Sequence, residues 1–231
     1  NVDEGDILRL GRTGIRFGLP KLLEVLDRFE VKATFFIPGA VVKRYPEAVA
    51  SIVERGHEIG CHGNNHEILA HMTVKEARDL LTKAAGKAPA GFRMPEGEIS
   101  EETLALVKTL GFSYSSSLSD DDVPYVRESG GLLELPIHWE LFDLPYFAFT
   151  FDPPIPPGQS RSARMDDVLK NWLYELEGAR RFGTLFNLQL DPQAIGEQGR
   201  IFMLEELLTE IQKAEDVWVT TGEEIASFFG A

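Results

Sequence analysis

The sequence predicts a parallel α/β fold, because strand and helix patterns alternate about seven times along the chain and hairpin signals are few. The segment 33–37 is a continuous apolar run, which is typical of a strand that is buried on both faces of a sheet. The sequence contains no GxGxxG motif, no P-loop and no GxSxG elbow, so a dinucleotide-binding fold has no support. We therefore expect an α/β barrel in a single domain, residues 1–231, with its site at the carboxyl ends of the strands.

The first half of the chain gives clear boundaries for its helices and strands. Pro20 lies near the start of the first helix, where its missing N–H costs little, and Gly56 and Gly86 end two later helices. Thr73 with Glu76 three residues on is a capping-box pattern, which predicts a helix start. We expect strands at 33–37, 59–61 and 91–93, and helices at 19–29, 46–55 and 73–85.

The second half continues the alternation. Ser100 predicts an N-cap, and Thr221 with Glu224 predicts a second capping box. An aromatic run at 146–151 leads into a proline-rich loop at 152–158. We expect strands at 112–115, 132–137, 184–190 and 217–219, and helices at 100–110, 166–182, 204–214 and 221–229.

The composition excludes several classes of partner and compartment. Asp and Glu number 37 against 23 Lys and Arg, so the net charge of −14 argues against nucleic acid or an anionic membrane as the main partner. The single cysteine, Cys61, excludes an internal disulfide, and we expect it to pack as a small apolar residue. With no apolar run long enough to cross a bilayer and no visible signal peptide, we expect a cytoplasmic protein.

The segment 145–157 is rich in aromatic residues and proline, and it would be costly to leave in water as one patch. We expect this segment to cover the site or to pack against another subunit, which would make the protein a homo-oligomer.

Two histidines follow the apolar segment 59–61 and are the strongest sign of chemistry in the chain. His62 and His66 are four residues apart, so on a helical turn both rings can face one spot and hold a transition metal such as Zn²⁺. A catalytic zinc usually has three protein ligands, so the third, a carboxylate, must come from elsewhere. The alternative is that both histidines are simply solvated in a polar loop. His57 precedes the strand, and we interpret it as a structural residue.

These motifs together resemble the polysaccharide deacetylases (carbohydrate esterase family 4), in the branch with peptidoglycan deacetylase-like and allantoinase- or cyclic-imidase-like hydrolases. The resemblance implies a distorted (β/α)7 barrel and hydrolysis of a non-peptide C–N bond, either in an N-acetylated glycan or in a small cyclic amide or imide. The matching runs are 32–37, 56–67, 91–95, 135–140, 145–147 and 190–196.

The resemblance also implies a set of site residues. It gives the metal, expected to be Zn²⁺, to an aspartate of the first strand, here Asp3, and to the two histidines of the pair, His62 and His66. In a second register Asp3 is instead the catalytic base and Glu4 the ligand; we favour Asp3 as the ligand. Arg93 matches an arginine that orients a catalytic carboxylate, a task that suits a bidentate guanidinium.

Two positions depart from the family pattern. Relatives carry a histidine where this chain has Asp191, as the general acid that protonates the leaving nitrogen. An aspartate can do this only if burial or a neighbouring carboxylate raises its pKa. In the favoured register Asn1 stands where the base is expected. These departures motivate an alternative, a catalytically impaired protein that binds a carbohydrate or small amide.

The aromatic residues after the strand at 132–137 are candidate walls of a substrate pocket, although an aromatic run is more often part of a core. They are Trp139, Phe142, Tyr146 and Phe147.

Overall fold

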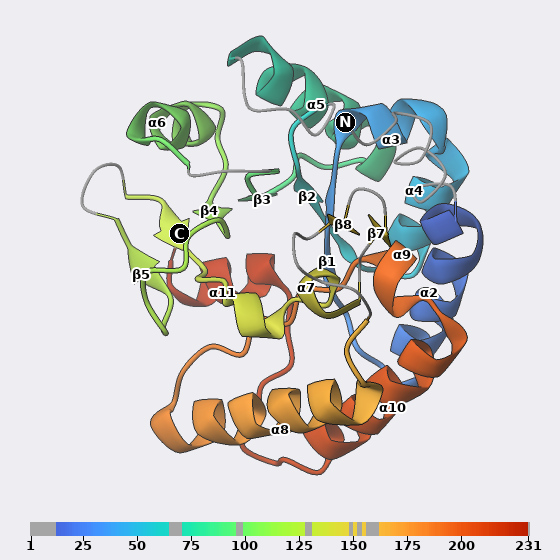
Figure 1. The fold of residues 1–231 in the computed structure, drawn as a ribbon. Helices are drawn as coiled ribbons and strands as arrows, with labels where there is room; N and C mark the ends of the chain where they lie inside the picture. The colour runs from blue at the N-terminus through green and yellow to red at the C-terminus, as the bar shows by residue number, and fades with distance from the viewer. Residues whose placement is uncertain are drawn as a thin grey trace. The chain divides into compact units, whose positions relative to one another are not determined.

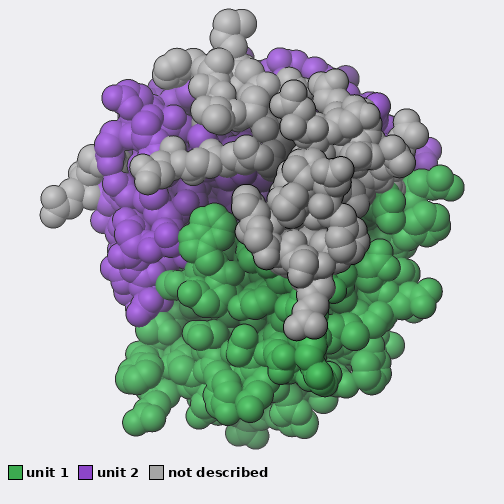
Figure 2. Space-filling view, viewed as in Figure 1, with its two compact units in different colours: residues 1–30, 138–218 green, residues 31–137, 219–231 purple. Residues whose placement is uncertain are grey.

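The structure is a computed structural model, and it forms two compact units, which we describe one at a time (Figure 2). Unit 1 contains residues 1–30 and 138–218, and unit 2 contains residues 31–137 and 219–231. Whether they act as the single domain predicted from the sequence stays a prediction. No helix in the described part of the chain is long and apolar enough to cross a membrane. The described residues are 13–64, 71–95, 99–127, 131–147, 150–151, 154–155 and 162–230.

Unit 2 is built on a six-stranded sheet whose order is β1-β2-β3-β4-β6-β5. The pairs from β1 to β6 are parallel, and β5 pairs antiparallel with β6 at the end of the sheet. Parallel pairing with helical connections confirms the α/β class that the sequence predicts. The strands are β1 (Thr34–Ile37), β2 (Glu58–Cys61), β3 (Gly91–Phe92), β4 (Tyr114–Ser115), β5 (Tyr125–Val126) and β6 (Leu133–Glu134).

Helices of unit 2 pack beside the first strands, and their predicted caps are largely confirmed. Helices α3, α4 and α5 contact one another, and α4 and α5 contact β2 (Figure 1). Ser100 caps α6 by accepting a hydrogen bond from the Thr103 N–H at 3.2 Å. Thr221 and Glu224 form the predicted capping box of α11. The helices are α3 (Gly39–Arg44), α4 (Pro46–Glu54), α5 (His71–Ala85), α6 (Glu101–Thr109) and α11 (Gly222–Phe228).

The predicted start of α5 is wrong. The helix begins at His71, two residues before Thr73, so the capping-box pattern does not mark its first turn. The Glu76 carboxylate instead accepts hydrogen bonds from Lys43 Nζ at 2.6 Å and from Asn64 Nδ2 at 3.2 Å. The Glu76 side chain, which the local pattern assigns to a cap at the helix start, therefore binds residues distant in sequence instead.

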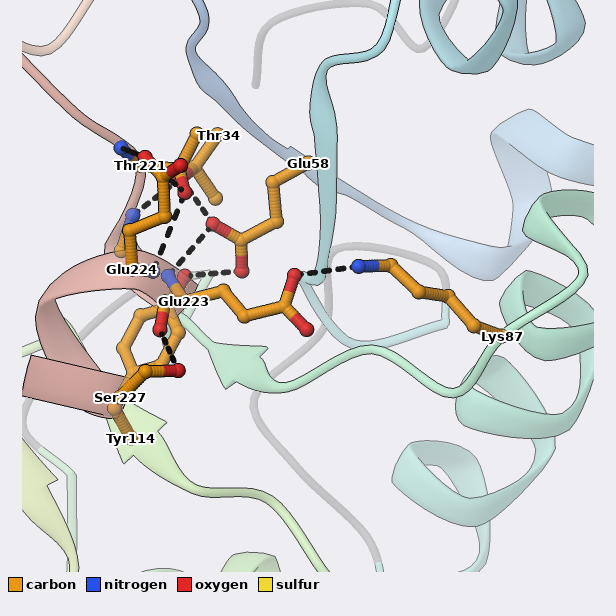
Figure 3. Close-up of polar contacts among 9 residues, drawn as sticks. Thr34, Glu58, Lys87, Tyr114, Thr221, Glu223, Glu224 and Ser227 are labelled. Carbon is orange, nitrogen blue, oxygen red and sulfur yellow. Dashed lines mark hydrogen bonds and ion pairs between the residues drawn. The ribbon is translucent and has the colours of Figure 1, made fainter. Parts of the chain in front are cut away.

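A buried carboxylate joins the last helix of unit 2 to its sheet (Figure 3). Glu58, at the start of β2, is 5% exposed and accepts hydrogen bonds from Thr34 Oγ1 at 2.6 Å, Tyr114 Oη at 2.7 Å and the Glu223 N–H at 2.9 Å. Burial raises the pKa of Glu58, and these hydrogen bonds partly oppose that rise. The N-terminus of α11 is thus fixed to β1, β2 and β4 through one side chain.

Unit 1 is mainly helical. Helix α10 packs against α8, α2 and α9, and the buried side of α10 includes Leu204, Leu207 and Leu208 (Figure 1). Gly183 ends α8 with a φ of 70°, a conformation that glycine adopts without strain. The elements are η1 (Gly14–Gly18, a π-helix), α2 (Leu19–Arg28), η2 (Trp139–Leu141), α7 (Leu144–Phe147), β7 (Thr150–Phe151), β8 (Pro154–Ile155), α8 (Met165–Phe182), α9 (Pro192–Ile195) and α10 (Gln198–Gln212).

Two predicted strands are not strands, and one helix is longer than predicted. Segment 184–190 makes only one bridge, between Gln189 and Phe142, and segment 217–219 has no strand hydrogen bonding among the described residues. Trp218 and Val219 are 59% and 47% exposed, so the β propensity of this segment is not supported by packing. Helix α10 begins at Gln198 rather than at 204.

Candidate functional site

His62 lies directly after β2, at the carboxyl end of the parallel strands, where catalytic side chains collect in α/β barrels. Its backbone N–H donates to Ile37 O at 3.2 Å, and its ring Nδ1 lies 2.9 Å from Arg93 O. A carbonyl oxygen can only accept, so Nδ1 carries the hydrogen, and the neutral ring presents the lone pair of Nε2. Metal-binding histidines are oriented by this kind of hydrogen bond, so the geometry fits a metal ligand.

The chain that follows His62 is held by α3. The N–H groups of Gly39 and Ala40 donate to the carbonyl oxygens of Gly63, at 3.0 Å, and Asn64, at 2.8 Å. Gly63 has a φ of 69°, which turns the chain sharply after the histidine. The two residues that follow His62 are therefore attached to the first turn of α3.

The other predicted ligands, Asp3 and His66, lie outside the described residues, as do Asn1 and Glu4. Within the described part of the chain, no group of three His, Cys, Asp or Glu side chains could hold a metal. His62 fits the metal-binding role on its own contacts, and the complete ligand set stays a prediction.

Arg93 is held by polar and aromatic contacts within unit 2. Its Nε donates to Ser116 O at 2.8 Å, its Nη2 donates to Ser116 Oγ at 2.6 Å, and its guanidinium carbon lies 4.4 Å from the centroid of the Phe36 ring. Burial lowers the pKa of Arg93 to about 10, so the group stays charged at neutral pH. The carboxylate that Arg93 is expected to orient is not among the described residues that contact it, so this role stays a prediction.

Asp191 is partly buried in unit 1, at the N-cap position of α9. Burial raises its pKa from 3.8 to about 6, and the backbone N–H of Gln193 opposes the rise in part. A carboxyl group with this pKa is about half protonated at pH 6 and still about one-tenth protonated at pH 7, so a fraction of the molecules can donate a proton, as a general acid must.

A second carboxylate, Asp143, is fully buried behind Asp191. The Asp191 backbone N–H donates to both oxygens of Asp143, at 3.1 and 3.0 Å. Burial raises the pKa of Asp143 well above its ordinary value, and the charge of Asp191 raises it further. Asp143 therefore fixes the backbone of Asp191. The sequence analysis missed it, although an aspartate between apolar residues, in Leu141–Leu144, was a signal for burial.

Glycines set the position of the helix that follows Asp191. A side-chain carbon on Gly196 would lie 2.2 Å from the Gly18 Cα, so α9 packs directly on the backbone of η1. Lys21 Nζ also donates to Gly196 O at 2.8 Å. A cavity of about 280 Å³ lies beside this contact, and none of the predicted site residues lines it. The tight contact fixes the end of α9 that lies opposite Asp191.

The four predicted aromatic residues differ in exposure. Trp139 is 63% exposed and lies 6.5 Å from the Phe142 ring, measured between centroids. Phe147 is only 4% exposed, and the Arg200 guanidinium lies 4.6 Å from its centroid. Tyr146 packs edge-on against Trp172 at 6.4 Å. Phe147 thus belongs to the core of unit 1, and substrate contact by any of the four stays a prediction.

Two interpretations of single residues agree with the structure. The buried His57 accepts a hydrogen bond at Nδ1 from the Ala33 N–H at 3.3 Å, at the opposite end of β2 from His62. Cys61 is fully buried, and burial raises the pKa of its thiol to about 12, so it is neither nucleophilic nor redox-active near neutral pH.

Comparison with known proteins gives consistent matches. The polysaccharide deacetylase family profile matches residues 13–115. A peptidoglycan deacetylase of Helicobacter pylori is 29% identical, over 96% of this chain and 87% of the relative. A solved structure from Mycobacterium smegmatis, assigned as a polysaccharide deacetylase, is 34% identical with a TM-score of 0.87, over 95% of this chain and 79% of that one. The structure of Puue allantoinase is 22% identical with a TM-score of 0.83, over 97% and 76% of the two chains, and shares the fold.

The structural match confirms the predicted fold class, the distorted (β/α)7 barrel. Its sequence identity extends over most of both chains, and the profile match includes His62 and Arg93. The chain belongs to the polysaccharide deacetylase family, whose members are hydrolases that cleave carbon–nitrogen bonds other than peptide bonds.

Proposed function

We propose that the protein is a metal-dependent N-deacetylase that removes acetyl groups from an N-acetylated glycan. The observation that carries the proposal is the hydrogen bond from His62 Nδ1 to Arg93 O, because it leaves the lone pair of the neutral ring on Nε2, the nitrogen that would donate it to a metal. The names of the relatives, which include peptidoglycan deacetylases, favour a glycan substrate. Because an allantoinase shares the fold, a small cyclic amide is the second candidate substrate.

The residues of this chain would divide the reaction as follows. Asp3, His62 and His66 would hold a divalent cation, expected to be Zn²⁺, which when bound supplies a Lewis acid for the amide carbonyl and for the attacking water. Arg93 would orient the carboxylate that takes a proton from that water. Asp191 would donate a proton to the leaving nitrogen, and its raised pKa supports that role. The exposed Trp139 would contact the sugar.

Metal content tests the proposal directly. We expect purified protein to contain about one divalent metal ion per chain and His62→Ala to lose most of it. His57→Gln is the matched control, because His57 lies at the other end of the same strand, and it should keep the metal. Equal metal content in His62→Ala and in the wild type would overturn the metal site.

Substrate identity needs a panel of N-acetylglucosamine oligomers, allantoin and cyclic imides, each assayed with added Zn²⁺. We expect release of acetate from the oligomers. Turnover of allantoin or an imide alone would select the cyclic-amide function. Binding of an oligomer without turnover of any compound would favour the impaired, binding-only protein.

A cytoplasmic location and a homo-oligomeric state are also part of the proposal. Light scattering at micromolar concentration tests the oligomeric state.

A further inference from the structure

The guanidinium of Arg93 has its plane fixed by an aromatic ring. Phe36 of β1 lies under it at 4.4 Å, a distance typical of cation–π contact. Phe36 faces Gly60 of β2 in the parallel register, and a side-chain carbon on Gly60 would lie 2.5 Å from the Phe36 ring. The Phe36 ring occupies the space that a side chain at position 60 would take. Because Gly60 has no side chain, the ring can lie there, and Arg93 stacks on it.

One edge of the same guanidinium is fixed by Ser116. Nε donates to Ser116 O and Nη2 donates to Ser116 Oγ. The backbone and the side chain of one residue therefore hold the Nε/Nη2 edge of the guanidinium. None of the described residues accepts a hydrogen bond from Nη1. The opposite edge of Arg93, with Nη1 and the second hydrogen of Nη2, is therefore the part that can meet a carboxylate in a bidentate pair.

The direction of the Ser116 hydroxyl is itself determined. Its single hydrogen is donated to Leu135 O at 2.8 Å, so its lone pairs point to Arg93. The turn that follows is fixed by Glu134, which is fully buried and accepts hydrogen bonds from the N–H groups of Ser117 at 2.5 Å and Leu118 at 3.0 Å. Ser116 thus has the polarity and the support needed to hold a cation in one orientation.

We propose that Ser116 is a positioning residue that selects which edge of Arg93 faces the catalytic carboxylate. The inference rests on the proposed function, since it acts through the role given there to Arg93. A fixed edge matters because a small misplacement of a catalytic group costs up to about 100-fold in rate. Substrate binding depends on other residues, so the effect belongs in kcat.

A double-mutant cycle tests the proposal. We expect Ser116→Ala to lower kcat about tenfold with KM changed less than about threefold, and Ser116→Thr, which keeps the hydroxyl, to recover most of the loss. In an Arg93→Lys background, Ser116→Ala should lower kcat less than about twofold, because lysine has no edge to select. The matched control is Ser115→Ala, since Ser115 is also buried and its hydroxyl donates to Ser117 Oγ and accepts no hydrogen bond from Arg93. An equal tenfold loss in both backgrounds would overturn the proposal.

A readout without turnover separates this inference from the proposed function. In protein labelled with ¹⁵N-arginine, the Nη2–H signal of Arg93, identified by its loss in Arg93→Lys, should exchange slowly with water, because Nη2 donates to Ser116 Oγ. We expect Ser116→Ala to shift the signal and speed its exchange, and Ser115→Ala to leave both unchanged. An unchanged signal in Ser116→Ala rejects the positioning role even if the enzyme is active. If the wild type turns over no substrate but Ser116→Ala still shifts the signal, the result rejects only the proposed function.

Discussion

Replacing Asp191 by asparagine tests the proposed general acid most directly. Asparagine keeps the size of the side chain and removes its titratable proton, while the Asp191 backbone N–H can still donate to Asp143. Asp191 is not a predicted metal ligand, so the variant should keep its metal. Loss of general acid catalysis is worth about 10²–10⁴-fold in rate, and we expect kcat to fall by that factor.

The raised pKa of Asp191 also sets the pH dependence. With a pKa of about 6, the carboxyl is about nine-tenths protonated at pH 5 and about one-tenth protonated at pH 7. If proton donation limits the rate, activity should fall about tenfold for each pH unit above 6. Asp191→His, which restores the residue used by relatives, should retain or increase activity, and the fall should move to higher pH.

The stability of the folded state should also fall as pH rises, and the Asp191→Asn variant should escape this loss. Because the pKa of Asp191 is higher in the folded chain than in the unfolded chain, the folded state loses stability as pH rises from about 3.8 through 6. Ionising the buried group costs at most about 3 kcal/mol, at about 1.4 kcal/mol for each pH unit. Asp191→Asn should therefore unfold at a higher urea concentration than the wild type at pH 8, and the two should converge near pH 4.

Steady-state deacetylation from pH 5 to 9 measures the effect on activity, and urea unfolding from pH 4 to 8 measures the effect on stability. Wild-type rates in Asp191→Asn would mean that Asp191 is only a structural residue at the start of α9. A wild-type activity that rises through pH 6 would show that Asp191 acts in its charged form, and the acid would then have to be another group.

Three further predictions concern stability in unit 2, and urea unfolding measures each. Gly60→Ala should destabilise by about 1–3 kcal/mol, because the new methyl group would overlap the Phe36 ring; an unchanged midpoint would mean that the ring moves freely. Thr221→Ala should cost about 1 kcal/mol through loss of the α11 cap, whereas Thr221→Ser, which keeps the hydroxyl, should cost much less. Glu58→Gln should cost about 1–3 kcal/mol at pH 7, because an amide NH₂ cannot accept from its three donors, and the difference should grow at low pH, because the raised pKa means that protonation of Glu58 stabilises the folded wild type. A cost that is independent of pH would contradict the raised pKa of Glu58.

Local signals in the sequence predicted the fold well where a short pattern decides the structure. The cap at Ser100 and the capping box at Thr221 are both present, since each involves only residues three positions apart. The same pattern failed at Thr73, because Glu76 finds partners in α3 and after β2. Patterns of this kind are thus reliable only when no tertiary partner competes for the side chain.

Predictions of strands depended on partners that the sequence does not reveal. Segment 184–190 has strong β character, yet its backbone hydrogen bonds to residues distant in sequence, among the described residues, involve only Gln189, which pairs with Leu141 and Asp143. A strand exists only where a neighbour supplies a ladder, and neighbours are set by the whole fold. This explains why the strands predicted at β1 and β2, which are neighbours in a parallel sheet, are confirmed, whereas the strand predicted at 184–190 is wrong.

The site could be predicted in part for a related reason. His62, Arg93 and Asp191 stand in motifs that can be recognised along the chain, whereas Ser116 and Asp143 act on residues 23 and 48 positions away. Ser116 is one of three consecutive serines, and nothing local distinguishes it from Ser115 or Ser117. Residues that orient others are defined by distance in space, so they become visible only when the strands are assembled.

The buried carboxylates of the two units differ in what their burial achieves. Glu58 and Asp143 accept hydrogen bonds from backbone N–H groups and join segments distant in sequence, and Glu134 does the same for the turn after β4. Burial of each carboxylate raises its pKa because the charged form loses water, and the hydrogen bonds from the backbone N–H groups partly offset that loss. The rise in the pKa of Asp191 is opposed only by the backbone N–H of Gln193, two residues along the chain, so among the described residues its burial joins no segments distant in sequence. A carboxyl that is costly to ionise and joins no distant segments is the one expected to serve the reaction.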